Sequence, residues 1–151
     1  MLRLWLLTAV LFSVAAACST SDVSEPDQMS TPDPAREIRA AADKMIAGIN
    51  ARGYAEVYDL IPSGCLEGLT SDELADDWRE FGELIGDPNF QLEITQFEVE
   101  AVSEDRAQVT AQVVAHTAAR DIPMGSTEDP FFDVFIREGG VWKVGDETYC
   151  P

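Results

Sequence analysis

Apolar residues recur every three or four positions in the first half of the folded part of this chain, and every second position in the rest. A period near 3.6 residues is typical of a helix that buries one face, and a period of two is typical of a half-buried strand. The first stripe predicts a helix beginning near Pro34, capped by Asp33 or Thr31, and ending at Asn50–Gly53. Its apolar members are Ile38, Ala41, Ala42, Met45 and Ile49.

Two more helices are predicted before the period changes. A short second helix has Tyr54, Val57, Tyr58 and Ile61 on its buried side and stops at Pro62-Ser63-Gly64. The third begins with the capping box Thr70-Ser71-Asp72-Glu73, in which the first and last residues each satisfy a free backbone donor. Its inner face is expected to contain Leu74, Trp78, Phe81 and either Leu84 or Ile85.

From Phe90 onward the pattern predicts four strands. In the first, the alternation changes parity near Gln96, which indicates a β-bulge that bends a long strand. The second runs from Ala107 to Ala115 with cleanly alternating residues, and Ile122–Pro130 is expected to be a loop. Phe131–Arg137 and Val141–Val144 are the remaining strands, joined by the hairpin signal Glu138-Gly139-Gly140.

Helices that precede an antiparallel sheet imply an α+β fold, with the helices packed on one face of a bent four-stranded sheet. This order, over Ala35–Gly145, resembles the cystatin-like cone of the nuclear transport factor 2-like superfamily, and the hairpin FFDVFIREGGVWKVGD carries the most specific part of the likeness. The resemblance implies a pocket between helices and sheet, with Tyr54, Tyr58, Trp78 and Phe81 as candidate lining residues. It also implies that a homodimer could form through the sheet, with Phe131, Phe135 and Val114 as a patch.

The N-terminus predicts export. Residues 1–17 contain a basic start at Arg3, the apolar run LWLLTAVLFSV and three alanines, which are the parts of a secretory signal. The run is too short for a membrane-spanning helix, which needs about 20 residues. The stretch VAAAC, ending at Cys18, resembles a bacterial lipoprotein signal, which implies cleavage before Cys18 and acylation of its sulfur. Ala15 stands where that family most often has Leu, and ordinary cleavage with secretion is the alternative.

Residues 18–34 would then be a lipidated cysteine followed by a polar tether, and residues 35–151 one folded domain. The tether is rich in Ser, Thr, Pro and Asp and cannot bury enough apolar surface to fold. About 117 residues suffice for one compact domain and are too few for two. We expect the protein to face outside the cytoplasm, on a bacterial cell membrane.

The chain is strongly acidic, with 28 Asp and Glu residues against 10 Lys and Arg, a net charge of −18. Nucleic-acid binding needs clusters of basic residues that displace counterions, so this class of partner is excluded. Anionic lipid headgroups would also repel the surface, which makes a covalent anchor the more reasonable attachment.

The other two of the 3 cysteines, Cys65 and Cys150, are expected to form a disulfide in an oxidising compartment. Such a bridge would close a loop of about 85 residues and stabilise the fold by roughly 4–5 kcal/mol. Two buried thiols are the alternative. Two cysteines and a single histidine, His116, are too few for a metal site, and no cofactor is expected.

Catalytic candidates are weak. Asp133 lies between Phe131 and Phe135 in the strand pattern, and a carboxylate in apolar surroundings could act as a general base. The alternative is that this face points outward and Phe132, Val134 and Ile136 fill the core. His116 lies on the more polar side of the second strand, and the acidic run around Asp72 and Asp77 is expected to be a solvated helix face.

These observations predict a non-enzymatic, lipid-anchored envelope protein whose domain binds a small apolar ligand or an envelope protein. An isomerase- or dehydratase-like enzyme that uses a pocket acid is one alternative, supported by fold analogy alone. A structural dimerisation module is the other.

Overall fold

The computed structural model describes residues 33–145 except 67, 127 and 129. These residues form an α+β domain in which helices precede the strands along the chain, as the sequence predicts. The elements are α1 (Pro34–Asn50), α2 (Tyr54–Tyr58), a 3₁₀ helix η1 (Ser63–Cys65), α3 (Ser71–Leu84), β1 (Gln91–Val102), β2 (Arg106–His116), β3 (Asp121–Met124), β4 (Phe132–Glu138) and β5 (Val141–Gly145).

The predicted helix starts are confirmed. Asp33 caps α1, because its side chain accepts a hydrogen bond from the backbone nitrogen of Ala35 at 3.1 Å. The capping box of α3 is present in full: Thr70 accepts from the backbone nitrogen of Glu73, and Glu73 accepts from that of Thr70 at 2.8 Å. The Thr70 hydroxyl, which also donates to the Glu73 carboxylate at 2.8 Å, and the Thr70 backbone nitrogen together hold the pKa of Glu73 below its usual value.

The sheet has five antiparallel strands rather than the predicted four. Its order is β1-β2-β4-β5, and β3 pairs with β2. The segment predicted as a loop therefore contains a short strand, which pairs with the last residues of β2, Val113–His116. β4 pairs with the first part of the same strand, between Arg106 and Ala111.

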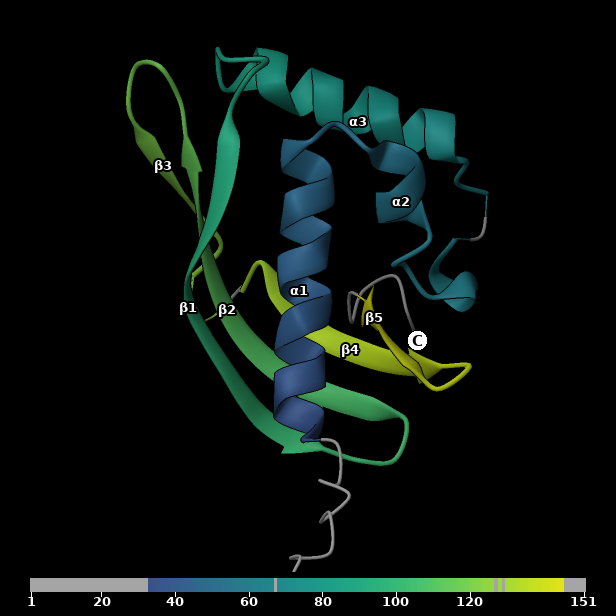
Figure 1. Ribbon diagram of the computed structural model, residues 1–151. Helices are drawn as coiled ribbons and strands as arrows, with labels where there is room; N and C mark the ends of the chain where they lie inside the picture. The colour runs from purple at the N-terminus through teal and green to yellow at the C-terminus, as the bar shows by residue number, and fades with distance from the viewer. Residues whose placement is uncertain (1–32, 67, 127, 129, 146–151) are drawn as a thin grey trace, which may run out of the picture. The chain divides into compact units, whose positions relative to one another are not determined.

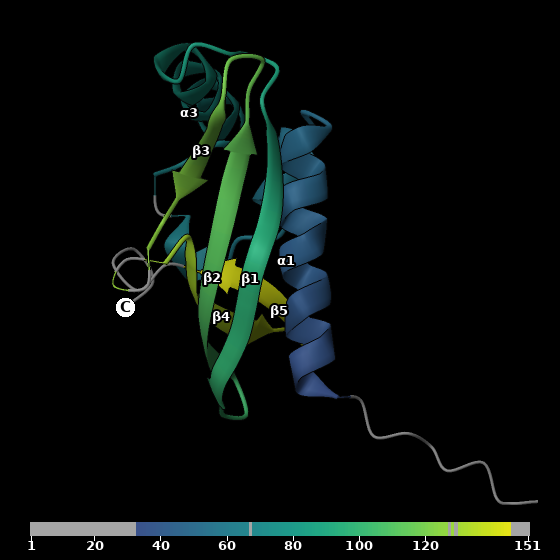
Figure 2. The same ribbon diagram turned by 90° about the vertical axis from the view of Figure 1, so that its left-hand side faces the viewer.

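The predicted β-bulge in β1 is confirmed, because the register with β2 shifts between Ile94 and Gln96. A second shift, which the sequence pattern does not predict, lies between Val99 and Ala101. Bulges increase local twist and bend a strand. Figures 1 and 2 show the result: β1 and β2 are long and curved, and α1 lies along the inside of the curve.

The alternation on β2 places its small apolar residues in the core as predicted. Every second residue from Ala107 to Ala115 is buried, and the residues between them are half-buried. The buried residues of α1, including Ile38, Met45 and Ile49, belong to the same core cluster. The concave face of the sheet is therefore packed against α1, while α3 crosses above one end of this layer (Figure 1).

Two side chains connect the end of α1 to the start of β1. Asn50 donates from Nδ2 to the carbonyl of Leu92 at 2.9 Å and accepts from the Leu92 nitrogen at 2.7 Å. Arg52, which has a positive φ of 61°, donates to the carbonyls of Ile49, Pro88 and Phe90. The Arg52 guanidinium also lies 4.6 Å from the centre of the Phe90 ring. These contacts anchor the helical layer to the sheet at the end where α3 crosses.

Candidate functional site

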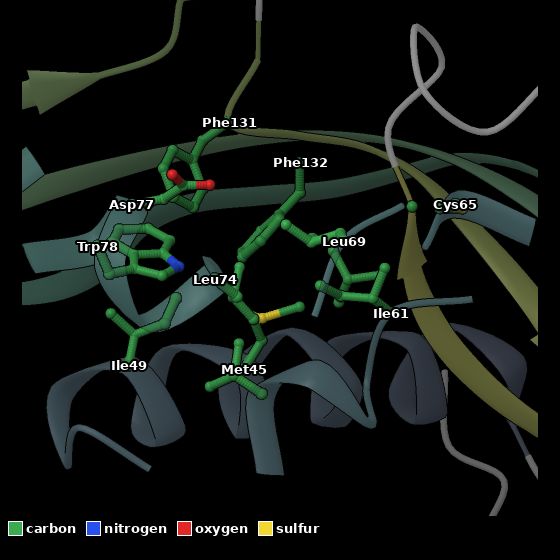
Figure 3. Close-up of a pocket in the computed structure, with 13 residues that line it drawn as sticks. Met45, Ile49, Ile61, Cys65, Leu69, Leu74, Asp77, Trp78, Phe131 and Phe132 are labelled. Atoms are coloured by element: carbon green, nitrogen blue, oxygen red, sulfur yellow. The ribbon is translucent and has the colours of Figure 1, made fainter. Parts of the chain in front are cut away.

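A cavity of about 590 Å³ lies between the helices and the sheet. This volume is within the range of about 300–1,000 Å³ that is usual for small-molecule sites. Figure 3 shows Met45 and Ile49 of α1 on one side, Phe131 and Phe132 on the opposite side, and α3 at one end. The lining residues are Met45, Ile49, Val57, Ile61, Cys65, Leu69, Leu74, Asp77, Trp78, Phe131, Phe132, Val144 and Gly145.

Most of the lining is apolar because it combines residues from several amphipathic elements. Met45 and Ile49 are one turn apart on α1, and Leu74 and Trp78 are one turn apart on α3. From the sheet, β4 contributes Phe132, and β5 contributes its last two residues, Val144 and Gly145. The cavity is therefore built from segments that are far apart along the sequence.

Of the four predicted lining residues, Trp78 lines the cavity and Tyr54, Tyr58 and Phe81 are not among the lining residues. Phe81 instead packs edge-on against Trp78, with ring centres 5.8 Å apart, and against Phe90 at 5.2 Å. Trp78 itself stacks on Phe90 at 6.2 Å. This aromatic cluster holds the indole of Trp78 in position at the α3 end of the cavity.

Tyr58 has a structural contact rather than a place in the cavity. Its hydroxyl donates to the carbonyl of Leu69 at 2.9 Å, which ties α2 to the segment before α3. Because Leu69 lines the cavity, Tyr58 helps to position the wall from behind. Tyr54 is half-buried at the first residue of α2.

Two polar groups of α3 lie at the cavity. Asp77, for which the sequence predicts a solvated helix face, is exposed and is also part of the cavity lining. The next residue, Trp78, directs its ring nitrogen toward the interior of the cavity (Figure 3). A sequence signal for Asp77 exists in retrospect, because Asp77 follows the buried Leu74 by three positions and therefore shares its side of α3.

Asp133 lies on β4, is half-buried and is not among the cavity-lining residues. The alternative alternation is found in part: Phe132 and Val134 are buried and Ile136 is half-buried, but Phe135, of the opposite parity, is buried as well. The reason is a register shift on β2 between Gln108 and Ala111, which changes the parity of β4 against the concave face. Asp133 therefore lies outside the lining of this cavity, and a catalytic role for it stays a prediction.

The patch predicted for dimerisation is divided by the same packing. Phe135 is fully buried in the core, Phe131 is partly buried and lines the cavity, and Val114 is half-buried on β2. Phe131 and Phe135 therefore do not form an exposed apolar surface together. A homodimer through the sheet stays a prediction.

His116 is part of a polar cluster across three strands. Its Nδ1 lies 2.8 Å from a carboxylate oxygen of Asp121 on β3, and its Nε2 lies 2.9 Å from one of Glu93 on β1. These hydrogen bonds, that of Asp121 first, raise the pKa of the imidazole above 6.5. The cluster is exposed, lies apart from the cavity residues, and links the strand ends.

A second polar cluster holds the end of β4 against η1. The Glu138 carboxylate accepts from the side chain of Lys143 at 2.7 Å and from both the backbone nitrogen and the hydroxyl of Ser63. These bonds, that of Lys143 first, lower the pKa of Glu138 to about 2. The cluster fixes η1, and with it Cys65, beside the hairpin of β4 and β5.

A smaller groove of about 310 Å³ lies between α1 and the β4–β5 hairpin, where Glu37, Lys44 and Trp142 are among the lining residues. The ring nitrogen of Trp142 is buried and has no hydrogen-bond acceptor among the described residues. The Arg137 guanidinium lies 5.8 Å from the Trp142 ring centre.

Cys65 lies in η1 at the cavity, whereas Cys18 and Cys150 lie outside the described residues. The lipidation of Cys18 and the pairing of Cys65 with Cys150 therefore stay predictions, as does the signal in residues 1–17. In the part of the chain that the structure describes, no three His, Cys, Asp or Glu side chains are grouped to hold a metal ion. Within the same residues, no helix has the length and apolar character needed to span a bilayer.

Comparison with known proteins adds little. No protein-family model matches the chain, and no curated protein does. Among solved structures, a variant of Rv3472, a protein of unknown function from Mycobacterium tuberculosis, is similar over 72% of this chain and 66% of its own. The sequence identity is 16% and the TM-score is 0.46, which is too low to carry a conclusion about function.

Proposed function

We propose that this chain is a cell-envelope lipoprotein, anchored through Cys18, whose domain binds a small apolar ligand in the cavity. The observation that carries the proposal is the cavity itself, which has the volume of a ligand site and a predominantly apolar lining. A ligand without an apolar body would lose its hydration over most of this lining, whereas an apolar body would exchange water for close packing.

The finer fold assignment belongs to the same proposal. We assign the domain to the cystatin-like cone of the nuclear transport factor 2-like superfamily. Support comes from the order of the elements, from the bulged and curved β1 and β2, and from a cavity between this sheet and the helices. In this superfamily the space between helices and sheet is the usual site of binding or chemistry.

Binding without turnover is the simpler use of this cavity. Enzymatic proton transfer needs an acid or base held against the substrate with further convergent polar groups. The pocket acid for which Asp133 was the candidate is not in the lining, and the carboxylate that does reach the cavity, Asp77, belongs to an exposed side chain. These positions favour a binding protein over an isomerase or dehydratase.

A dye titration with two tryptophan variants tests the binding site. N-phenylnaphthylamine is neutral and becomes fluorescent in apolar surroundings, so its binding reports an accessible apolar cavity. Ile61→Trp adds bulk to the lining, whereas Leu84→Trp makes a similar change at a side chain that is 84% exposed and outside the lining. We expect saturable binding to the wild type and Leu84→Trp, and about tenfold weaker binding to Ile61→Trp.

Equal binding by all three proteins would place the dye elsewhere and would contradict the cavity as the site. Unchanged far-ultraviolet circular dichroism of Ile61→Trp is the control that its loss of binding is local. A catalytic role would instead show as consumption of a bound ligand by purified protein.

The anchor has a separate test. Cys18→Ser removes the only sulfur that could be acylated at the predicted cleavage point. We expect the wild type in the membrane fraction with a mass increase of two or three acyl chains, since one chain binds only marginally. The Cys18→Ser variant should lack this mass increase and be absent from the membrane fraction. Membrane recovery of Cys18→Ser equal to that of the wild type would refute the anchor.

A further inference from the structure

The cavity has one polar end, formed by two consecutive residues of α3. Asp77 brings a carboxylate to the rim, and Trp78 brings an indole N–H that faces the interior (Figure 3). Neither group has a hydrogen-bond or ion-pair partner among the described residues, whereas the neighbouring Asp76 pairs with Arg79 at 2.6 Å. The opposite end of the cavity is lined by apolar side chains such as Ile61 and Leu69 and by Cys65 (Figure 3).

These two groups offer complementary hydrogen bonds. An ionised carboxylate only accepts, and an indole N–H only donates. A hydroxyl head group can satisfy both, since it donates to Asp77 and accepts from Trp78. A protonated amine can donate to Asp77 and pair with its charge. A carboxylate head group would accept from Trp78 but would lie against the negative charge of Asp77.

The charge of the whole protein acts in the same direction. With a net charge of −18, the surface potential lowers the local concentration of anions and raises that of cations. We propose that the ligand is an amphiphile with an apolar chain or ring body and a neutral or cationic head group that donates hydrogen bonds, and that anionic amphiphiles such as fatty acids are excluded. This assignment of the ligand class rests on the proposed function of the cavity.

The test compares three ligands that share one alkyl chain: dodecanol, dodecylamine and dodecanoate. Each is titrated, below its micelle concentration and at neutral pH, against the wild-type protein loaded with N-phenylnaphthylamine. We expect dodecanol and dodecylamine to displace the dye, and dodecanoate to bind at least about tenfold more weakly than either.

Asp77→Asn removes the charge and keeps the size of the side chain. It should weaken dodecylamine binding by about three- to tenfold and strengthen dodecanoate binding, because the head group of each then meets a neutral amide. Glu80→Gln is the matched control, since it makes the same charge change at an exposed residue of α3 outside the lining. Its affinities should equal those of the wild type.

Trp78→Phe keeps an aromatic ring against Phe90 and removes the N–H donor. It should weaken dodecanol binding by about threefold or more relative to dodecylamine, which does not accept from that donor. Wild-type binding of dodecanoate as tight as that of dodecanol would overturn the ligand class and leave the apolar site standing. Equal effects of Asp77→Asn and Glu80→Gln on the binding of dodecylamine and dodecanoate would likewise overturn the ligand class but not the apolar site. Failure of the dye itself to bind would overturn both proposals.

Discussion

Replacing Asn50 by alanine should loosen the junction between α1 and β1. The side chain of Asn50 forms two hydrogen bonds to the backbone of Leu92, one as donor and one as acceptor. Leu92 is only 4% exposed, so water has little access to the nitrogen and carbonyl that the variant leaves without their partner. Asn50 and Leu92 lie 42 positions apart in sequence, so no residue next to Leu92 in the chain can replace these hydrogen bonds.

The magnitude follows from these contacts. Each hydrogen bond contributes about 0.5–1.5 kcal/mol net, and an unsatisfied buried group adds to the loss. We therefore expect Asn50→Ala to lower the free energy of unfolding by about 2 kcal/mol. For a domain of this size, that corresponds to a fall in Tm of about 8 °C.

Urea unfolding followed by circular dichroism measures the change. Asn89→Ala is the matched control, because Asn89 is an exposed residue whose side chain has no described hydrogen bond, and it should stay within about 0.5 kcal/mol of the wild type. Asn50→Asp keeps the acceptor and loses the donor, and should also be destabilised. A loss below about 0.5 kcal/mol in Asn50→Ala would refute the role of this junction.

Three further changes test the polar contacts of the fold. Thr70→Ala removes the cap of α3 and should cost about 1 kcal/mol in a urea melt, while a cost near zero would show that the capping box does not stabilise this helix. The pKa of His116 is raised in the folded state, so its stabilisation is present below pH 6.5 and is lost as the pH rises through the folded pKa. His116→Gln should therefore be less stable than the wild type near pH 6 and match it at high pH, and a pH-independent difference would contradict the cluster. The pKa of Glu138 is lowered from 4.5 to about 2, so its stabilisation is present above pH 4.5 and is lost as the pH falls toward 2. Glu138→Gln should be destabilised at neutral pH and lose that difference in acid, and equal melting at neutral pH would refute the contact.

Local patterns predicted much of the fold because they depend on neighbouring residues. The capping box of α3 is complete within four residues, and its hydrogen bonds form wherever that helix starts. The alternation along β2 predicted the buried face correctly, since this strand has neighbours on both sides over most of its length. The parity change near Gln96 predicted the bulge for the same local reason.

Pairings set by distant segments could not be predicted in this way. β3 has four residues, one of them Pro123, and so short an alternation beside proline does not by itself predict a strand. It is extended because the end of β2 is available beside it, which is a tertiary effect. The parity of β4 likewise depends on a register shift in β2, which buries both Phe132 and Phe135 although they have opposite parity in the strand.

The sequence predicted where the cavity lies, but only some of the residues that line it. Resemblance to a cone fold indicated a pocket between helices and sheet, and Trp78, one of the four candidates, lies in the cavity lining. Phe81 was placed there because it shares the apolar side of α3, but its ring is used to support Trp78. Asp77 was missed because charged residues on an acidic helix are normally solvated, and only the arrangement of α3 over the cavity gives it another use.

Nuclear magnetic resonance of the methionine methyl groups tests the central claim most directly. Met45 lines the cavity, whereas Met124 lies on β3 and outside the lining, so the two methyl groups distinguish a ligand in the cavity from one elsewhere. With isotope-labelled methionine and dodecanol as the ligand, we expect the Met45 resonance to shift saturably while that of Met124 stays unchanged. A Met45 resonance that does not move while the alcohol binds, or a shift confined to Met124, would contradict an apolar ligand site between the helices and the sheet.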